Sequence, residues 1–175
     1  MGRHVEVVPY HSDWPKRFAM EAAELSAIFG ERLLSIHHFG STSIPGTSAK
    51  PIIDILVIVK DINTVDTLNP RLLKMGYSAI GEYGIPGRRF FYKGTHELRS
   101  HHLHVYQAGN PHILRHLAFR DFMRTHPLHA QAYSLLKESL ASQFPEDMES
   151  YIAGKSDFIK EHEKRALEWY WKRDK

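Results

Sequence analysis

A polar loop that runs directly into a buried strand with one acid is the part of this sequence best suited to phosphate chemistry. The stretch FGSTSIPGTSAKPIIDILVIV occupies residues 39–59. Gly40 lets the backbone approach a ligand closely, and Ser41 and Thr42 offer hydroxyl groups to an anion. Asp54 lies within the apolar run, where a lone carboxylate is costly unless a cation or several donors meet it. The pattern predicts that a largely shielded Asp54 and the Gly40–Ser41 turn lie together at one open edge of a sheet.

The apolar run around Asp54 is typical of a strand that is covered on both faces. Side chains alternate along a strand, so Ile52, Asp54, Leu56 and Ile58 are expected to share one face. An ion pair between Asp54 and Lys50 would give the acid a purely structural role. We favour a functional role, because buried acids are rare and tend to be paired or bound to metal.

Two histidines on a later predicted strand are candidate partners for Asp54. His102 and His104 in the segment HLHVY share a strand face and could converge on one ligand. Direct contact with a phosphate or nucleotide is the favoured role, since histidine readily supplies N–H donors. Asp54, His102 and His104 would also satisfy a single-metal site. The candidate cofactors are therefore divalent Mg, Mn or Zn, although imidazole suits Zn or Mn better than Mg.

Basic side chains are concentrated between residues 88 and 124, where only Glu97 and Asp121 are acidic. Arg120 and Arg124 are four residues apart on one predicted helical face, a spacing at which two guanidinium groups can clamp a phosphate. A salt-bridge network with Asp121 is an equally weighted alternative. The candidate phosphate- or nucleotide-binding residues are Gly40, Ser41, Thr42, Lys50, Arg88, His102, His104, Arg120, Arg124 and Lys155.

An aromatic run, Trp169 to Trp171, ends the last predicted helix. Rotation along a helix separates consecutive side chains, whereas base stacking needs a shared open face. The run is therefore expected to serve core or interface packing.

The elements that must position these residues alternate in an α+β pattern. Apolar spacing, capping residues and glycine or proline boundaries predict one N-terminal helix, a small mixed sheet and a C-terminal helical region. The segment 61–76 is expected to be helical in parts, interrupted by Pro70 and closed by Gly76. The predicted helices are 12–30, 110–126, 128–144 and 147–173, and the predicted strands are 33–40, 51–59, 77–80, 88–94 and 101–109.

Composition limits the classes of protein to which the chain can belong. With 175 residues, of which 42% are hydrophobic and 25% charged, it resembles an ordinary soluble globular protein. The formal charge of +3 is too small to predict nucleic-acid binding, and the absence of cysteine excludes disulfides and thiolate sites. No run is apolar enough to span a bilayer and no signal peptide is recognisable, so we expect a cytoplasmic protein without a membrane partner.

The Gly-Ser loop followed by a strand acid resembles the nucleotidyltransferase fold, although Leu56 stands where that pattern has a second acid. The wider sequence is similar to the GrpB family in the segments DWPKRFAME, HHFGSTSIPGTSAKPIIDILV, HHLHVYQAG, RHLAFRDFMRTHP, AYSLLKESLA and YIAGKSDFI. Members of this family are also found fused to dephospho-CoA kinase. The resemblance implies a nucleotidyltransferase-like core in residues 1–109 and a helical region, residues 110–175, packed on it as one unit.

These features leave three functional hypotheses. The chain is expected to bind a nucleotide or another phosphate-containing molecule, and it is a candidate nucleotidyl or phosphoryl transferase in which Asp54 and Ser41 are catalytic. Such transfer usually uses two Mg²⁺ ions held by several carboxylates, and Leu56 removes one of these ligands. The alternative is a catalytically inactive binding or folding-partner module linked to coenzyme A metabolism. A single-metal hydrolase built on Asp54, His102 and His104 is the remote third.

Overall fold

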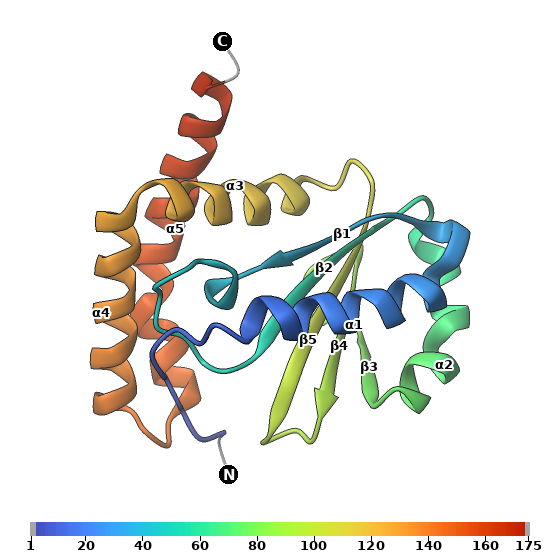
Figure 1. Ribbon diagram of the computed structural model, residues 1–175, viewed down its shortest axis with the longest axis horizontal. Helices are drawn as coiled ribbons and strands as arrows, with labels where there is room; N and C mark the ends of the chain where they lie inside the picture. The colour runs from blue at the N-terminus through green and yellow to red at the C-terminus, as the bar shows by residue number, and fades with distance from the viewer. Residues whose placement is uncertain (1–2, 174–175) are drawn as a thin grey trace. The chain divides into compact units, whose positions relative to one another are not determined.

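The computed structural model describes residues 3–173, and Figure 1 shows its helices and strands. The contacts divide the chain into two compact units. One consists of residues 12–39 and 52–113 and is called the sheet unit below. The other contains the described residues 3–11, 40–51 and 114–173 and is called the helical unit.

The sheet unit is built on one five-stranded mixed sheet, with strand order β1-β2-β5-β4-β3. The strands β2 and β5 are parallel neighbours, and the other neighbours are antiparallel. Their bounds are β1 Leu33–Phe39, β2 Ile53–Val59, β3 Tyr77–Gly81, β4 Arg88–Gly94 and β5 Arg99–Gln107. The register pairs Asp54 with Phe39 on one side and with His102 on the other. The predicted mixed sheet is thus confirmed, and its register brings the predicted site strands together.

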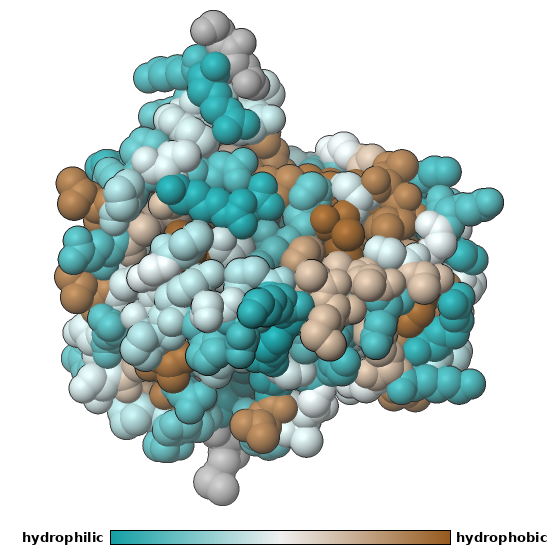
Figure 2. Space-filling model, viewed as in Figure 1, coloured by the Kyte–Doolittle hydropathy of each residue, from teal (hydrophilic) through white to brown (hydrophobic). Residues whose placement is uncertain are grey.

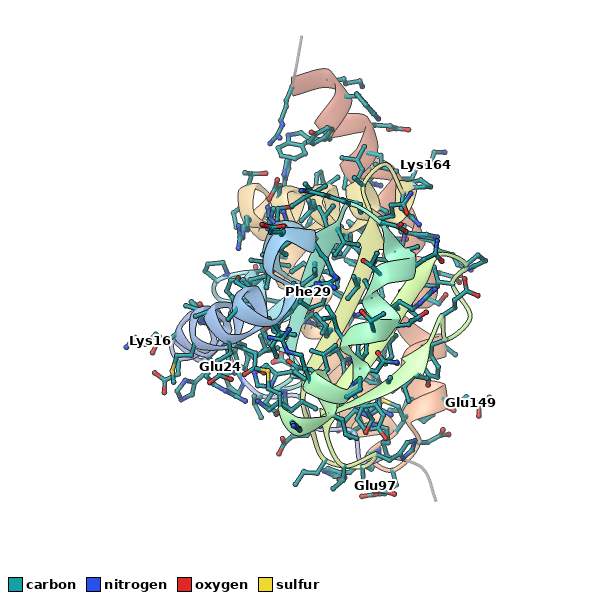
Figure 3. All side chains as sticks on the ribbon, turned by 90° about the vertical axis from the view of Figure 1, so that its right-hand side faces the viewer. Lys16, Glu24, Phe29, Glu97, Glu149 and Lys164 are labelled. Atoms are coloured by element: carbon teal, nitrogen blue, oxygen red, sulfur yellow. The ribbon has the colours of Figure 1, made fainter. Side chains whose placement is uncertain are left out.

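Helix α1, Trp14–Phe29, lies across one face of this sheet (Figure 1). Its apolar face buries Leu25 and Phe29 completely, and Phe29 is labelled in Figure 3. Glu21 on the same helix accepts hydrogen bonds from Tyr77 Oη and Lys93 Nζ, each at 2.9 Å. Burial lowers the pKa of His101 to about 4, and the nearby Glu21 carboxylate opposes this effect. A buried carboxylate is therefore matched by its own donors, which ties α1 to strands β3 and β4.

The segment between β2 and β3 differs in one detail from its prediction. It forms a 3₁₀ helix, η3 Ile62–Leu68, followed by α2 Asn69–Lys74. Pro70 lies in the first turn of α2 and so begins this helix rather than interrupting one. The first turn has no helical acceptor for its N–H groups, so the missing N–H of proline costs nothing there. Gly76 follows with φ of 103°, as expected of a residue that ends a helix.

The helical unit contains most of α3, Pro111–Thr125, together with α4, Pro127–Gln143, and α5, Met148–Arg173. Ile44 from the polar loop packs with Phe122 and Met123, and Val5 packs with Leu140 and Tyr151. These apolar contacts join residues 1–11 and 40–51 to the C-terminal helices. The predicted domains 1–109 and 110–175 stay a prediction, since each of the two units combines several segments of the chain.

None of the helices in residues 3–173 is long and apolar enough to cross a membrane. Polar residues cover most of the face seen in Figure 2, and the apolar residues there gather in small groups. Individually exposed large apolar side chains, such as Leu98 and Leu128, are common on protein surfaces.

Gly94 ends β4 at a turn that tolerates no side chain. Its φ is 109°, and a Cβ at this position would overlap the carbonyl oxygen of Leu98. Gly94→Ala is expected to lower the free energy of unfolding by about 3 kcal/mol, since backbone strain and steric overlap add together. Urea denaturation measures the change.

Gly84→Ala is the matched control for this substitution, because Gly84 has a φ of 86° but no atom within 4 Å of the added Cβ. Gly84→Ala should lower the free energy of unfolding only by the backbone strain, which is about 1 kcal/mol. Equal losses in the two variants would contradict the overlap at Gly94.

Candidate functional site

In the sheet unit, the carboxylate of Asp54 lies between the two predicted histidines. Asp54 Oδ1 is 3.6 Å from His102 Nδ1 and 3.7 Å from His104 Nε2. The parallel pairing of β2 and β5 produces this arrangement, because it sets Asp54 beside His102 and Leu56 beside His104 on one sheet face. The Asp54 side chain is 26% exposed, so the acid is shielded without being sealed from solvent. The predicted convergence of the two histidines is therefore present in the structure.

Each histidine also contacts an arginine through its other ring nitrogen. Arg99 Nη1 lies 3.3 Å from His102 Nε2, and Arg88 Nη1 lies 3.4 Å from His104 Nδ1. A guanidinium group can only donate hydrogen bonds, so these two imidazole nitrogens must be acceptors. The neutral tautomers that result carry their protons on the nitrogens facing Asp54. Both rings consequently direct an N–H group at the carboxylate.

Phe90 and two loop carbonyls support this arrangement. The Phe90 ring packs edge-on against both imidazoles, with centroid distances of 5.3 and 5.1 Å. Arg88 is held further by the carbonyl oxygens of Glu82 and Tyr83, which accept from its Nε and Nη2 at 3.1 and 2.8 Å. The imidazole rings therefore have little freedom to turn away from the acid.

The ionisation of Asp54 follows from these contacts. Burial alone would raise its pKa, but the N–H groups that His102 and His104 direct at the carboxylate outweigh this effect and hold the pKa below the usual range. Asp54 is therefore a carboxylate at neutral pH, ready to accept a hydrogen bond or to meet a cation.

The residues around Asp54 do not fit a pair of Mg²⁺ ions. Leu56 is completely buried two residues further along β2, and β5 contributes imidazoles where further carboxylates would be needed. The described residues 3–173 contain no group of three His, Cys, Asp or Glu residues arranged to hold a metal ion. In the tautomers above, the nitrogens that face Asp54 carry protons and offer no lone pair to a metal. The metal set Asp54, His102 and His104 stays a prediction that this arrangement does not favour.

In the helical unit, the polar loop is anchored by a buried lysine. Gly40, with φ of 72°, precedes a 3₁₀ turn, η2 Ser41–Ser43. Lys137 on α4 is 1% exposed, and its Nζ donates to Ser41 Oγ at 2.7 Å. The ammonium also lies 4.2 Å from the centroid of the Tyr133 ring, which favours the positive charge. A fixed cation therefore stands at the head of the Gly-Ser turn.

A second cation contacts the same turn from α3. Arg124 Nε donates to the carbonyl oxygen of Ser43 at 2.9 Å. Partial burial and, to a smaller extent, repulsion from Arg120 lower the pKa of Arg124. Arg120 itself pairs with Asp121, at 2.9 Å between Nε and Oδ1. Of the two arginines predicted to clamp a phosphate, Arg124 contacts the loop, whereas Arg120 forms the salt bridge with Asp121 that was the alternative.

Two predicted phosphate ligands meet at Tyr151. Lys50 Nζ and Lys155 Nζ lie 5.5 and 4.8 Å from the centroid of its ring. The Tyr151 hydroxyl is buried and has no hydrogen-bond partner in residues 3–173, and burial raises its pKa. Lysines at the end of the loop and on α5 are therefore held near one aromatic ring.

Several basic residues between 88 and 124 are engaged in ion pairs. Arg89 pairs with Asp66 at 2.9 Å, Lys93 with Glu21 at 2.9 Å, and Arg115 with Glu163. The acids come from outside the basic segment, so its composition could not disclose them. These three side chains have structural roles in their units.

Ser41 and Asp54 belong to different units, so their predicted meeting at one edge stays a prediction, as do the site roles of the other candidates. The sequence interpretation missed Lys137. The available signal was one lysine among apolar residues in the helical segment AYSLLKESLA, a pattern in which it lies on the helix face that is buried.

Comparison with known families and structures agrees with the predicted resemblance. The model of the family described as GrpB protein matches residues 4–165. The chain is 46% identical over 167 residues to the UPF0157 protein YqkA of Bacillus subtilis, covering 95% of this chain and 48% of that protein. It is 37% identical to the glutamate-rich protein GrpB of Alkalihalophilus pseudofirmus, covering 90% of this chain and 92% of that protein.

Further similarities extend to a kinase and to solved structures. A dephospho-CoA kinase of Mycolicibacterium paratuberculosis is 26% identical over 94% of this chain and 46% of its own length. The crystal structure of conserved protein GrpB from Enterococcus faecalis has a TM-score of 0.92 and 45% identity, covering 95% of this chain and 99% of that one. The Cid1 poly(U) polymerase has a TM-score of 0.50 at 13% identity, covering 77% of this chain and 43% of the polymerase, which is a likeness of fold alone.

Proposed function

This chain belongs to the GrpB family and has a nucleotidyltransferase-like fold, and from that premise we propose that it binds a nucleotide or another phosphate-containing small molecule. The phosphate is assigned to the Gly40–Pro51 loop, and the contact between Lys137 and Ser41 carries the assignment. The Lys137 ammonium and the Ser41 hydroxyl lie side by side at the head of the loop, where both can donate hydrogen bonds to one ligand. A phosphate oxygen beside Ser41 would accept from the two groups, and the charge on the lysine would strengthen the contact.

Other features of the helical unit support the same ligand. Gly40, with its positive φ, begins the 3₁₀ turn that carries Ser41 and Thr42 at the start of the loop. Arg124 contacts the end of this turn, and Lys50 and Lys155 lie at the other end of the loop around Tyr151. Cations from three helices and from the loop itself thus surround a Ser- and Thr-rich segment, which favours a ligand with more than one negative charge.

Ser41→Ala tests this proposal by calorimetric titration with inorganic pyrophosphate, ATP and UTP. The parent should bind pyrophosphate or a nucleotide, and the variant should bind it about tenfold more weakly, because one hydrogen bond to a charged group is lost. Ser139→Ala is the control, since Ser139 is exposed on α4, and its affinity should equal that of the parent. Absence of binding by the parent would overturn the proposal.

Phosphoryl or nucleotidyl transfer is a second candidate, favoured by the ionised Asp54 between two N–H donors. In this role Asp54 would accept the proton of an attacking hydroxyl group, while His102 and His104 hold the carboxylate in position. No step through two Mg²⁺ ions is included, because Leu56 and the two imidazoles do not provide their ligands.

A binding or folding-partner role linked to coenzyme A metabolism is the non-enzymatic alternative. It is favoured by the similarity to a dephospho-CoA kinase, of which the matched region makes up 46%. In that case Asp54 would only stabilise the sheet unit, and its replacement would change stability but not chemistry.

A further inference from the structure

The helical unit contains an open groove of about 470 Å³ that shares none of its lining residues with the Gly40–Pro51 loop. It lies between the last turn of α3 and the distal half of α5, whose final turns extend past α3 in Figure 1. The residues that line it are Phe122, His126, Arg165, Glu168, Trp169, Lys172 and Arg173. The five from α5 follow helical spacing and form one stripe along its surface.

Three aromatic rings form one wall of the groove. His126 stacks on Phe122 with a centroid distance of 4.0 Å, and Trp169 meets the two rings edge-on at 5.6 and 6.0 Å. The Nδ1–H of His126 donates to the carbonyl oxygen of Phe122 at 2.8 Å, which fixes the imidazole plane. Trp169 is partly buried against the same apolar cluster. The aromatic surface is therefore held in place before any ligand arrives, which reduces the entropy lost on binding.

Charge at the groove is predominantly positive. Its lining contains three cationic side chains and one carboxylate, Glu168. Arg165 pairs with Glu161 at 3.0 Å, and the Arg173 guanidinium lies 5.0 Å from the centroid of the Trp169 ring. Lys172 and Arg173 are exposed at one end of the aromatic wall. An apolar ligand would make no favourable electrostatic contact with these side chains, and a cationic ligand would be repelled by them.

We propose that this groove binds a nucleotide, with its base against Trp169 and His126 and its phosphate beside Lys172 and Arg173. Fixed aromatic rings and a row of cations are the two elements by which proteins hold unpaired nucleotides without reading their sequence. The volume is within the range of small-molecule sites, so it accommodates one nucleotide unit. The bound nucleotide is either a free mononucleotide or one residue of a single strand. The site does not depend on the function proposed for the Gly40–Pro51 loop.

Trp169 itself provides the readout. Trp14 is 2% exposed whereas Trp171 is 59% exposed, so Trp171→Phe leaves Trp169 as the reporter that can respond at the surface. This full-length variant is titrated with AMP, UMP and a short oligouridylate while tryptophan fluorescence is followed. Saturable quenching is expected. If the mononucleotides bind as tightly as the oligouridylate, the ligand is a free nucleotide. If the oligouridylate binds more tightly, the ligand is a single strand.

Charge variants complete the test in the same Trp171→Phe background. Replacing Lys172 and Arg173 by alanine should weaken binding about tenfold and reduce its dependence on salt. The control replaces Lys160 and Lys164, which are exposed on α5 outside the groove and carry the same total charge; Lys164 is labelled in Figure 3. Unchanged fluorescence with all three ligands would overturn the proposal. So would equal weakening in the two double variants, since that indicates attraction by overall charge only.

Discussion

Lys137→Met is expected to weaken the binding of pyrophosphate and nucleotides about 100-fold while leaving the chain folded. Lys137 is 1% exposed, and its ammonium group stands at 2.7 Å from Ser41 Oγ at the head of the polar loop. Removing the cation from the proposed lysine–phosphate contact should cost about 2.7 kcal/mol of binding free energy, which corresponds to this factor. Calorimetric titration of the parent and the variant measures it.

The stability of the same variant separates a ligand site from a structural contact. Methionine has a similar length and no charge, so it keeps the packing of the lysine stem and removes the hydrogen bond to Ser41. If Lys137 contacts the ligand, affinity should fall by far more than this single hydrogen bond lowers the free energy of unfolding. If Lys137 is only structural, the variant will be less stable and its affinity will be unchanged. Lys164→Met, on an exposed position of α5, should alter neither quantity.

Asp54→Asn is expected to lower the free energy of unfolding by about 1–3 kcal/mol, because it removes the charge of a partly buried carboxylate that two imidazole N–H groups face. The carboxylate lies between two imidazole N–H groups, at 3.6 and 3.7 Å. Both nitrogens face the same oxygen, Oδ1, and an amide oxygen in its place is an uncharged and weaker acceptor for the two N–H groups. The arginines behind His102 and His104 hold the rings in tautomers that direct both N–H groups at this oxygen. Urea denaturation of the two proteins gives the difference.

Activity measurements with Asp54→Asn distinguish transfer from binding. If the chain is a transferase with Asp54 as proton acceptor, turnover should fall about 10³-fold while nucleotide affinity changes little. Asp66→Asn is the matched control, because Asp66 forms a surface pair with Arg89 and its side chain is 56% exposed. It should change stability by less than about 1 kcal/mol. An Asp54→Asn protein as stable as the parent would contradict the stabilising role of the ionised carboxylate between the two histidines.

The sequence by itself determined the elements and the acid-bearing strand. The β-branched run around Asp54 forms β2, the alternation in HLHVY places His102 and His104 on one face of β5, and the spacing of apolar residues marks α1. Such patterns are local, since the period of the hydrophobic residues is set by the geometry of a strand or helix. The sequence located Pro70 in a helical segment but did not predict its effect there, because a proline can begin a helix as well as interrupt one.

Only the tertiary structure decided which side chains meet. Lys137 reaches Ser41 across 96 positions of the chain. Lys93 on β4 is paired with Glu21 of helix α1, so a basic segment that suggests an anion-binding surface is partly neutralised in the fold. The imidazole protons that face Asp54 follow from Arg88 and Arg99, whose approach depends on strand register and turn geometry. Pairing between distant residues is governed by packing and by hydrogen-bond geometry in three dimensions. No local period in the sequence records it.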